Sequence, residues 1–401
     1  MNKILIKVPD YVKYMSEWGE YIFPKGHVIV DKGVTGYGYT EYCLTNNLNI
    51  VLCSPRKMLL ESKSRKHSGD PNIKYIENTI IDYSSSKSFE DKVKDHVDNC
   101  FNVFGQPCKI LVTYDSCYRV VKALKDLGIL DQFYFVADEF QSIFLDSYFK
   151  SEVELDFVDA LQDCKNVLYL SATPMLEEYL DRLEDFKSLP FYEMNWDGSG
   201  YTESVTVQRK LVKSLISECN EITQSYKSGN YPVTLNRDGK VTYSTEAVFY
   251  FNSVSDITQV IKKNNLTPGE VNILCSKSDD TKRKLEKLSR ELGYTKKSGL
   301  LGFEVGKVPL KGEPNKMFTF CTSAVYMGID LHSDNASTYV FADPNISCLA
   351  LDISLDLPQI AGRQRDDNNP FKNTINLFYR IKRKGEVALT YEEFKKSQEK
   401  S

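Results

Sequence analysis

Histidine and tryptophan are scarce in this sequence, with four and two residues among 401, and none of the ten cysteines belongs to a CxxC pair. These shortages argue against a zinc module and against a disulfide framework. Ten thiols in no paired arrangement are typical of a reducing compartment, so we expect the protein to be cytoplasmic. No apolar run reaches the roughly 18 residues that a membrane-spanning helix needs, and residues 1–6 turn polar too soon for a signal peptide. We therefore expect no membrane partner.

The net charge is also small, because 55 acidic residues nearly balance 51 basic ones to give −4. Apolar residues make up 41% of the chain and charged residues 26%, which is typical of a globular protein with a sizeable core. The slightly acidic balance excludes a simple polycation that coats nucleic acid. It leaves open an enzyme that carries one local basic groove on a neutral body.

A short apolar run, a turn and a helical pattern recur along the chain. The runs are rich in Val, Ile, Leu and Phe without alternation, which predicts strands buried on both faces and hence parallel α/β sheets. The expected strands are 27–30, 49–53, 109–112, 133–137, 166–170, 247–251, 271–275, 317–321, 337–341 and 374–379. They divide into two sets around a linker at 187–201. We expect domains at 1–195 and 196–401, the second ending in a short helix over 391–401.

A glycine-rich loop over 33–40, Gly-Val-Thr-Gly-Tyr-Gly-Tyr-Thr, follows an expected strand and precedes an expected helix. A phosphate needs inward-pointing backbone N–H groups, a helix N-terminus and a hydroxyl that can hold Mg²⁺. The loop matches the pattern G-x-x-x-x-G-K-[ST] except that Tyr39 replaces the lysine. Losing one preorganised charge donor costs about 3–4 kcal/mol in other enzymes. Lys32 could substitute for it; alternatively, the loop is only a turn.

An apolar run over 133–137 ends in two carboxylates, Asp138 and Glu139. Hydrolysis of a magnesium nucleotide needs such a pair, because one carboxylate binds the water shell of the metal and the other polarises the attacking water. A surface acidic pair at a strand end is the alternative. A third motif, Ser171-Ala172-Thr173, follows another expected strand, where its hydroxyl groups could bond the carboxylate motif and the neighbouring domain or simply cap the turn.

The order of these three motifs resembles that of superfamily 2 helicases. Residues 322–330, Thr-Ser-Ala-Val-Tyr-Met-Gly-Ile-Asp, are similar to motif V of that family, and residues 359–365, Gln-Ile-Ala-Gly-Arg-Gln-Arg, to its motif VI. Weaker similarities link residues 53–56 to motif Ia, 112–116 to motif Ib and 249–253 to motif IV. Each motif alone is poorly specific, but together they keep the family's order and spacing over most of the chain.

The resemblance implies a fold and a site. The fold is α/β, with two RecA-like parallel-sheet domains that form a P-loop NTPase helicase core. ATP would bind with Mg²⁺ in the cleft between the domains, and single-stranded nucleic acid would cross the top of both. The expected partner is single-stranded or duplex DNA or RNA. By position, Thr40 and Asp138 would hold Mg²⁺ and Glu139 would position the attacking water. Arg363 and Arg365 would reach the γ-phosphate from the second domain as arginine fingers.

Further roles follow from the same resemblance. Gln359 would sense the nucleotide, Asp330 would lie near the ribose or brace the interface, and Ser171 and Thr173 would couple hydrolysis to domain movement. The nucleotide-binding residues would be Lys32, Gly33, Thr35, Gly36, Tyr37, Gly38, Tyr39 and Thr40, with Gly328 and Asp330 from the second domain. Contacts to the nucleic-acid backbone would come from Pro55, Arg56, Thr113, Ser253 and Thr322. From position alone, Tyr21 and Phe23 are candidates to stack on adenine.

Two departures from the helicase pattern stand out. Tyr39 replaces the loop lysine, and the second arginine of motif VI lies two residues after Arg363 instead of three. The lysine-less loop and the stretch 362–371 resemble helicase-like ATPases of large tailed phages that infect gut bacteria. That resemblance implies a viral protein that acts in replication in the host cytoplasm.

The leading functional hypothesis is an ATP-dependent helicase or translocase on DNA or RNA, targeted by a replication or repair partner protein. The alternative is a helicase-like accessory protein that binds nucleic acid with weak or lost ATPase activity, because Tyr39 replaces the lysine. A small-molecule P-loop kinase is a distant third. Two basic clusters, over 56–66 and 282–290, could track a phosphate backbone or be solvated helix faces.

Overall fold

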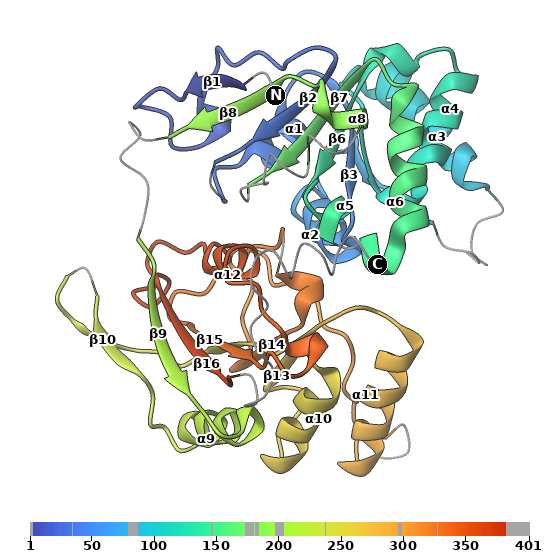
Figure 1. Cartoon of the computed structure of the whole chain (residues 1–401). Helices are drawn as coiled ribbons and strands as arrows, with labels where there is room; N and C mark the ends of the chain where they lie inside the picture. Colours follow the sequence, from blue (N-terminus) through green and yellow to red (C-terminus); the bar gives the residue numbers. More distant parts are fainter. Residues whose placement is uncertain are drawn as a thin grey trace, which may run out of the picture.

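Each half of the chain builds its own parallel sheet in the computed structural model, and the two sheets form two lobes, one above the other in Figure 1. The structure describes residues 3–33, 35–78, 87–145, 147–172, 180, 184–196, 204–236, 238–295, 299–326 and 328–381. Along these ranges, no helix has both the length and the apolar character that crossing a membrane requires. The α/β class with two parallel sheets, predicted from the apolar runs, is confirmed.

The first sheet has eight strands, and every neighbouring pair in it is parallel. Across the sheet, they are β1 (Lys3–Lys7), β8 (Phe191–Asn195), β2 (His27–Asp31), β7 (Asn166–Ser171), β6 (Phe133–Asp138), β3 (Asn49–Ser54), β5 (Lys109–Thr113) and β4 (Ile73–Tyr75). The stretch 187–201 is therefore not all linker, because β8 lies within it and pairs with β1 and β2. Only two of the five residues of β8, Phe-Tyr-Glu-Met-Asn, are buried, and polar residues occupy some of the other positions. The strand therefore has no continuous apolar run by which the sequence could reveal it.

The second sheet has six parallel strands. Across the sheet, they are β13 (Val271–Leu274), β14 (Phe318–Cys321), β12 (Ala247–Tyr250), β15 (Ser337–Ala342), β16 (Thr374–Tyr379) and β9 (Thr206–Leu211). A separate antiparallel hairpin joins β10 (Val233–Leu235) to β11 (Val241–Tyr243). All ten expected strands are present, and the expected C-terminal helix over 391–401 lies outside the described residues.

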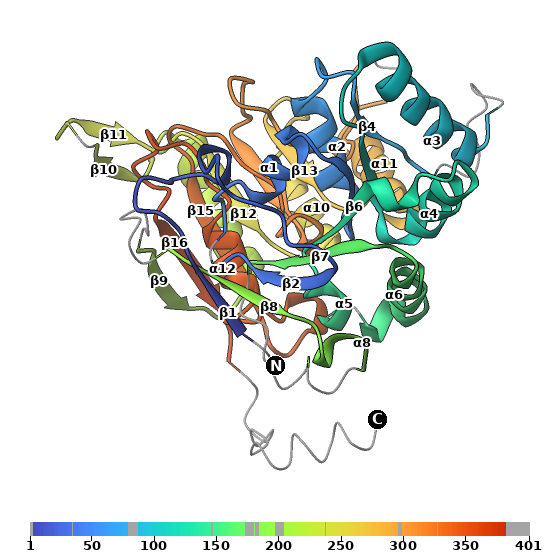
Figure 2. The same ribbon diagram turned by 90° about the horizontal axis from the view of Figure 1, so that it is seen from above.

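Helices cover both faces of the first sheet (Figure 2). On one face, α3 (Phe89–Asp98), α4 (Cys117–Asp126) and α6 (Ser147–Gln162) bury Val93, Val120 and Phe157 against the strands. On the other face, α1 (Tyr39–Thr45) and α2 (Lys57–Lys66) bury Leu44 and Leu60. Two short helices, α5 (Ser142–Leu145) and α8 (Glu184–Lys187), also lie in this lobe. Burial on both faces explains why its strands are continuously apolar.

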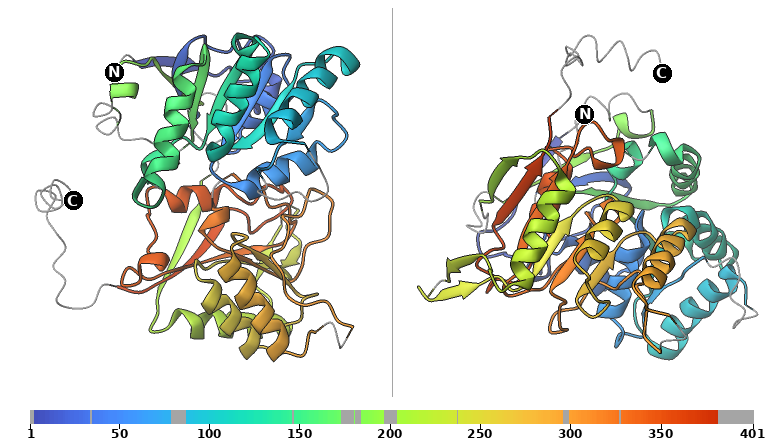
Figure 3. Two further views of the ribbon diagram at one scale, coloured as in Figure 1. Left: turned by 90° about the vertical axis from the view of Figure 1, so that its right-hand side faces the viewer. Right: turned by 90° about the horizontal axis from the view of Figure 1, so that it is seen from below.

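The second sheet is covered differently on its two faces. Helices α9 (Leu215–Lys227), α10 (Val254–Lys263) and α11 (Asp279–Glu291) pack on the face away from the first lobe (Figures 1 and 3). The other face is covered by α12 (Asp356–Ala361), by Val325, Tyr326, Ile329 and Leu331, and by Met58 of the first lobe. That face therefore meets the edge of the first sheet where its strands end.

Helix α2 carries many of the contacts between the lobes. Arg65 donates to the Val308 carbonyl at 2.7 Å and pairs with both carboxylate oxygens of Glu313 at 2.8 and 2.9 Å. Lys277 reaches back to Glu61 at 2.7 Å. Gly328 has a φ of +76°, and a side chain there would collide with Leu59. The two lobes are thus packed closely along one side of α2.

Candidate nucleotide site

The glycine-rich loop connects β2 to α1. Gly33, Gly36 and Gly38 have φ values of +72°, +93° and +76°, in the left-handed region that glycine adopts at little cost. At Gly33 a side chain would collide with the Met194 carbonyl, so the loop lies close to the end of β8. Gly38 precedes the first turn of α1, whose N-terminal N–H groups form a ready site for an anion.

Trp196, directly after β8, packs against this loop and is hydrogen-bonded to the residue that precedes it. Its Nε1–H donates to the Lys32 carbonyl at 2.8 Å, and its ring stacks on Tyr37 with centroids 4.1 Å apart and an interplanar angle of 17°. Trp196 is 4% exposed. Sequence patterns did not single it out, because a lone tryptophan after a short strand carries no motif.

Lys32, the last residue before the loop, is paired with Asp138 at the end of β6. Its Nζ lies 2.8 Å from Oδ1 of Asp138, and the Thr40 hydroxyl donates to Oδ2 of the same carboxylate at 2.9 Å. Both partners of the ion pair are buried. Burial opposes both charges, but the Asp138 and Glu139 carboxylates raise the pKa of Lys32, and the Lys32 ammonium lowers the pKa of Asp138. The pair is therefore charged on both sides.

The donors at this point suit Mg²⁺. A carboxylate and a hydroxyl 2.9 Å apart are hard oxygen ligands of the kind that Mg²⁺ takes beside water and phosphate. Thr40 and Asp138, predicted as the metal ligands, are brought together by the fold.

Tyr39 is the residue at the position of the loop lysine, and its side chain points away from the loop. It is 3% exposed, shares a 2.7 Å hydrogen bond with the Tyr21 hydroxyl, and packs against the Tyr21 and Phe23 rings. The Tyr39 side chain therefore belongs to the core, and only its backbone faces the glycine loop. Tyr21 and Phe23 lie in this core cluster with Tyr42, so the expectation that they stack on adenine is wrong.

Glu139 has an unusual backbone, with φ of +57° in a residue other than glycine. Such a conformation costs about 1–3 kcal/mol and persists only where its surroundings hold it. The Tyr114 hydroxyl donates to the Asp138 carbonyl at 2.7 Å, and the Phe140 N–H donates to the Leu170 carbonyl at 2.8 Å. Gln141 donates to the buried Glu139 carboxylate at 2.6 Å. The carboxylate is thus held in one place at the end of β6.

Arg363 is fixed inside the second lobe. Its Nε donates to the Gln359 carbonyl at 2.7 Å, Nη1 to the Ile329 carbonyl at 3.0 Å, and Nη2 to Oε1 of Gln359 at 2.8 Å. Burial, and then the charge of Arg365, lower the pKa of Arg363. Gln359, predicted to sense the nucleotide, accepts hydrogen bonds from Arg363 through its carbonyl and its side-chain oxygen. Its buried Nε2 has no hydrogen-bond partner among the described residues.

Arg365 crosses from the second lobe to the loop of the first. A side chain at Gly36 would collide with the Arg365 guanidinium, and one at Gly362 would collide with the Thr35 side chain. Nε of Arg365 donates to Oδ1 of Asp330 at 2.7 Å. Burial, the largest single effect, disfavours the charged Asp330 carboxylate, but Arg365, Lys63 and Arg363 together lower the pKa of Asp330. Asp330 therefore braces Arg365 against the glycine loop.

The residues predicted to contact nucleic acid stand at the carboxyl ends of strands, where ligands of open parallel sheets bind. Pro55 and Arg56 are partly exposed after β3. The Thr113 hydroxyl is bonded to Asp115 and Ser116, and the Ser253 hydroxyl caps α10 by accepting from the Asp256 N–H at 3.2 Å. Thr322 and Ser171 are buried, and Thr173 lies outside the described residues.

The first basic cluster is largely paired. Lys63 and Lys66 lie 3.5 and 2.9 Å from Glu41, and Lys57 lies 3.4 Å from Glu77. In the second cluster, Lys284 lies 2.7 Å from Asp280. These contacts favour the interpretation of both clusters as charged helix faces.

Two parallel sheets in tandem, with one face of the second sheet turned toward the first lobe, define a tandem RecA-like fold. The structure is similar to S. cerevisiae Dbp5 bound to RNA and ADP BeF3, at 12% identity and a TM-score of 0.52 over 90% of this chain and 80% of that one. It is also similar to the DEAD-box helicase Mss116 bound to ssRNA and UDP-BeF, at 13% identity and a TM-score of 0.52 over 93% and 76% of the chains. These likenesses show the fold.

The helicase Lhr of Mycobacterium smegmatis, bound to ssDNA and AMP-PNP, matches at 9% identity and a TM-score of 0.49 over 88% of this chain. The chain spans 44% of the length of Lhr. No family model and no curated protein matches the sequence.

Proposed function

We propose that the chain binds ATP between its two lobes and couples hydrolysis to movement along single-stranded DNA or RNA, as a superfamily 2 helicase or translocase. The observation that carries the proposal is the place of Arg365. Its guanidinium lies against Gly36 of the glycine loop, although it belongs to the other lobe. An always-charged donor that reaches a phosphate loop from a second domain is suited to stabilising charge that develops on a transferring phosphoryl group.

The carboxylates supply the other half of the chemistry. Thr40 and Asp138 would hold Mg²⁺, which would neutralise phosphate oxygens when bound. Glu139 is buried and fixed by Gln141, and it orients and polarises the attacking water.

Lys32 takes over the role of the loop lysine. Its ammonium stands at the same carboxylate as Thr40, at the mouth of the glycine loop, so it is close to the position where phosphates meet the N-terminus of α1. In this proposal Lys32 moves from Asp138 to the phosphates when nucleotide binds, and the Asp138 oxygen that it leaves becomes available as a ligand.

Nucleic acid crosses the strand ends of both lobes. Pro55, Arg56 and Thr113 line the path in the first lobe, and Ser253 and Thr322 line it in the second. Opening and closing at Arg365 then moves these two surfaces relative to one another. A replication or repair partner, a viral origin and action in the host cytoplasm stay predictions from sequence resemblance.

The second candidate is an accessory protein that binds nucleic acid with little hydrolysis. Two observations favour it: Tyr39 supplies no positive charge and is buried in the core, and the Lys32 ammonium is already paired with Asp138.

The deciding experiment is steady-state ATP hydrolysis at low salt, with and without single-stranded DNA and RNA, beside Glu139→Gln as the inactive control. Turnover that rises with nucleic acid and is lost in Glu139→Gln supports the motor. Turnover no higher than that of the control, with strand binding retained, supports the accessory protein.

A further inference from the structure

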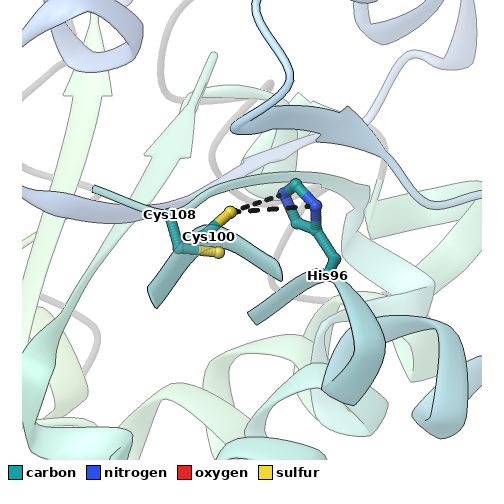
Figure 4. Close-up of side chains that lie close together, drawn as sticks. All are labelled: His96, Cys100 and Cys108. Carbon is teal, nitrogen blue, oxygen red and sulfur yellow. Dashed lines mark hydrogen bonds between the residues drawn. The ribbon is translucent and has the colours of Figure 1, made fainter. Parts of the chain in front are cut away.

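Three side chains with metal-binding atoms lie close together near the start of β5 (Figure 4), whereas the glycine loop and Asp138 lie where strands of the same parallel sheet end. They are His96 of α3, Cys100 of the following π-helical turn (Asn99–Phe104) and Cys108, directly before β5. All three are at most 2% exposed, and their ligand atoms lie within 4.8 Å of one another. The spacing contains no CxxC pair, which explains why the sequence argued against a zinc module.

The histidine ring lies beside the Cys100 sulfur and is hydrogen-bonded to the backbone. Its Nε2 lies 3.2 Å from the Lys109 carbonyl, and because a carbonyl can only accept, Nε2 carries the proton. The ring lone pair is then on Nδ1, and Sγ of Cys100 lies close to both ring nitrogens, 3.9 Å from Nδ1 and 3.7 Å from Nε2. Metal-binding histidines usually donate their second ring N–H to a backbone carbonyl in this way.

The backbone brings the two sulfurs to this ring. His96 and Cys100 are four residues apart on successive helical turns, so they share one face. The chain forms a π-helical turn at Cys100, a geometry that is rare and frequent at functional sites. Gly105, with φ of +60°, ends this turn, and the Gln106 N–H closes it on the Cys100 carbonyl at 3.0 Å. Cys108 follows within three residues of the turn's end.

We propose that His96, Cys100 and Cys108 form a zinc site that is separate from the nucleotide site. Two thiolates and a neutral imidazole are soft ligands of the type that Zn²⁺ takes, unlike the oxygen donors of Thr40 and Asp138. Binding deprotonates both thiols, so two protons pass to solvent for each Zn²⁺ that enters. The loaded site then has no net charge, which suits its burial; a monovalent copper ion would leave a charge of −1 there.

The fourth position of a tetrahedral ion has a neutral donor nearby. The Asn72 carbonyl oxygen accepts from the Lys109 N–H at 2.9 Å and from the Cys100 thiol at 3.8 Å, and the thiol proton leaves when a metal binds. A carbonyl has two lone pairs, so this oxygen can complete the coordination.

The site would act on the stability of the first lobe. It ties the end of α3 to the start of β5, and Lys109 next to it donates to the Cys43 and Leu48 carbonyls at the end of α1 at 2.9 and 2.6 Å. Because α1 begins at the glycine loop, zinc would stabilise the element that carries the loop. This inference does not depend on the proposed ATPase.

The test uses the full chain, stripped with a chelator and reloaded with zinc sulfate. Metal content after gel filtration, measured by mass spectrometry, and the thermal unfolding temperature are the readouts. We expect one zinc per chain and a higher unfolding temperature in the wild type. Cys100→Ser and Cys108→Ser should lose both, whereas the control Cys164→Ser, a buried thiol outside the cluster, should keep both.

A measurement on the wild type alone guards against variants that fail to fold. Co²⁺ added to the stripped chain should give a thiolate-to-metal charge-transfer band and the visible bands of a tetrahedral site. Absence of zinc and of these bands in the wild type would overturn the proposal. So would equal zinc content in Cys100→Ser and Cys164→Ser, or a Cys100–Cys108 disulfide that forms in air and does not yield to zinc under reducing conditions.

Discussion

Lys32 and Asp138 form a buried ion pair, 2.8 Å long, between the residue before the glycine loop and the carboxylate that also accepts from Thr40. The loop lacks a lysine at position 39, but Lys32, between the end of β2 and the loop, is paired with the expected metal ligand. The two residues lie 106 positions apart in the sequence. This pairing is the relationship on which the proposed site depends.

Removing one partner of the ion pair should destabilise the fold. Lys32→Met leaves an uncompensated buried carboxylate, so we expect a loss of about 3–5 kcal/mol in the free energy of unfolding. The double variant Lys32→Met/Asp138→Asn should recover part of that loss, because no unpaired charge is left. Urea unfolding of the two single variants and the double variant measures the coupling, and strictly additive losses would show that the pair does not interact.

Arg365 should act on catalysis and not on ground-state binding. Arg365→Ala is expected to lower kcat for ATP about a thousandfold or more with little change in KM, because arginine fingers contribute roughly that much in the transition state. Arg365→Lys should not restore the rate, since an ammonium lacks the planar fork. Arg209→Ala, an exposed arginine on β9, is the matched control. An unchanged kcat in Arg365→Ala would contradict the assignment.

The positive φ of Glu139 predicts an inverted preference between glycine and alanine. Both substitutions remove the carboxylate and its bond to Gln141, but only alanine keeps the cost of a left-handed backbone. Glu139→Gly should therefore be more stable than Glu139→Ala by roughly 1 kcal/mol. At Glu218, within α9, the order should reverse, because alanine favours a helix. Denaturant unfolding of the four variants measures both differences; an alanine preference at both positions would refute the role of strain.

Trp196 should tune nucleotide binding through the loop that it holds. Trp196→Phe keeps the stack on Tyr37 but removes the bond to the Lys32 carbonyl, at a cost of about 1 kcal/mol. Trp196→Ala removes both contacts, so we expect KM for ATP to rise in the order wild type, Phe, Ala. Trp18→Phe serves as the control. Equal KM values in all variants would show that Trp196 only packs.

The charge cluster between α1 and the end of α2 should make stability depend on pH. His67 lies 2.8 Å from both Glu41 and Asp70, and its hydrogen bond to Glu41 raises the pKa of His67 above its usual range. This contribution is complete below the unfolded pKa of about 6.5 and fades as pH rises through the raised folded value.

Glu41 titrates at the acid side of the same cluster. Burial opposes its charge, but the hydrogen bond from His67, the charge of Lys63 and the hydrogen bond from Lys66 lower the pKa of Glu41 to about 2. Its contribution is present above its usual pKa and is lost as pH falls toward 2. Urea unfolding as a function of pH should show both slopes. His67→Gln should flatten the pH dependence of the unfolding free energy above about pH 6.5. Glu41→Gln should flatten it both there and on the acid side. An unchanged pH dependence in these variants would contradict this assignment.

The fold was predictable where a strand is buried on both faces, because such a strand needs a continuous run of apolar residues. Runs such as Val28-Ile29-Val30 are buried on both faces, so they mark their strand. Strand β8 was not predicted, because three of its five residues are partly exposed and its sequence has no continuous apolar run. The loop, Asp138 and Arg365 were predictable as motifs, but their partners were not. Which lysine meets Asp138, and which glycine lies beneath Arg365, depends on how strands far apart in the sequence come together in the sheets.

The contacts that hold the motifs in place had no sequence signal. Gln141 bonds Glu139 from two residues away, and Trp196 supports a loop more than 150 residues earlier in the chain. The cluster of His96, Cys100 and Cys108 was hidden for a similar reason, since a π-helical turn and not a short spacing brings its members together.

The most direct test of the central claim is ATP turnover by Lys32→Ala with saturating single-stranded nucleic acid, beside the wild type and the exposed control Lys25→Ala. The account predicts that Lys32→Ala loses turnover about a hundred- to thousandfold, as when one preorganised charge donor is removed, while Lys25→Ala is unchanged. Near-ultraviolet circular dichroism would confirm that the variant is folded at the assay temperature. Wild-type turnover in a folded Lys32→Ala protein would contradict the account.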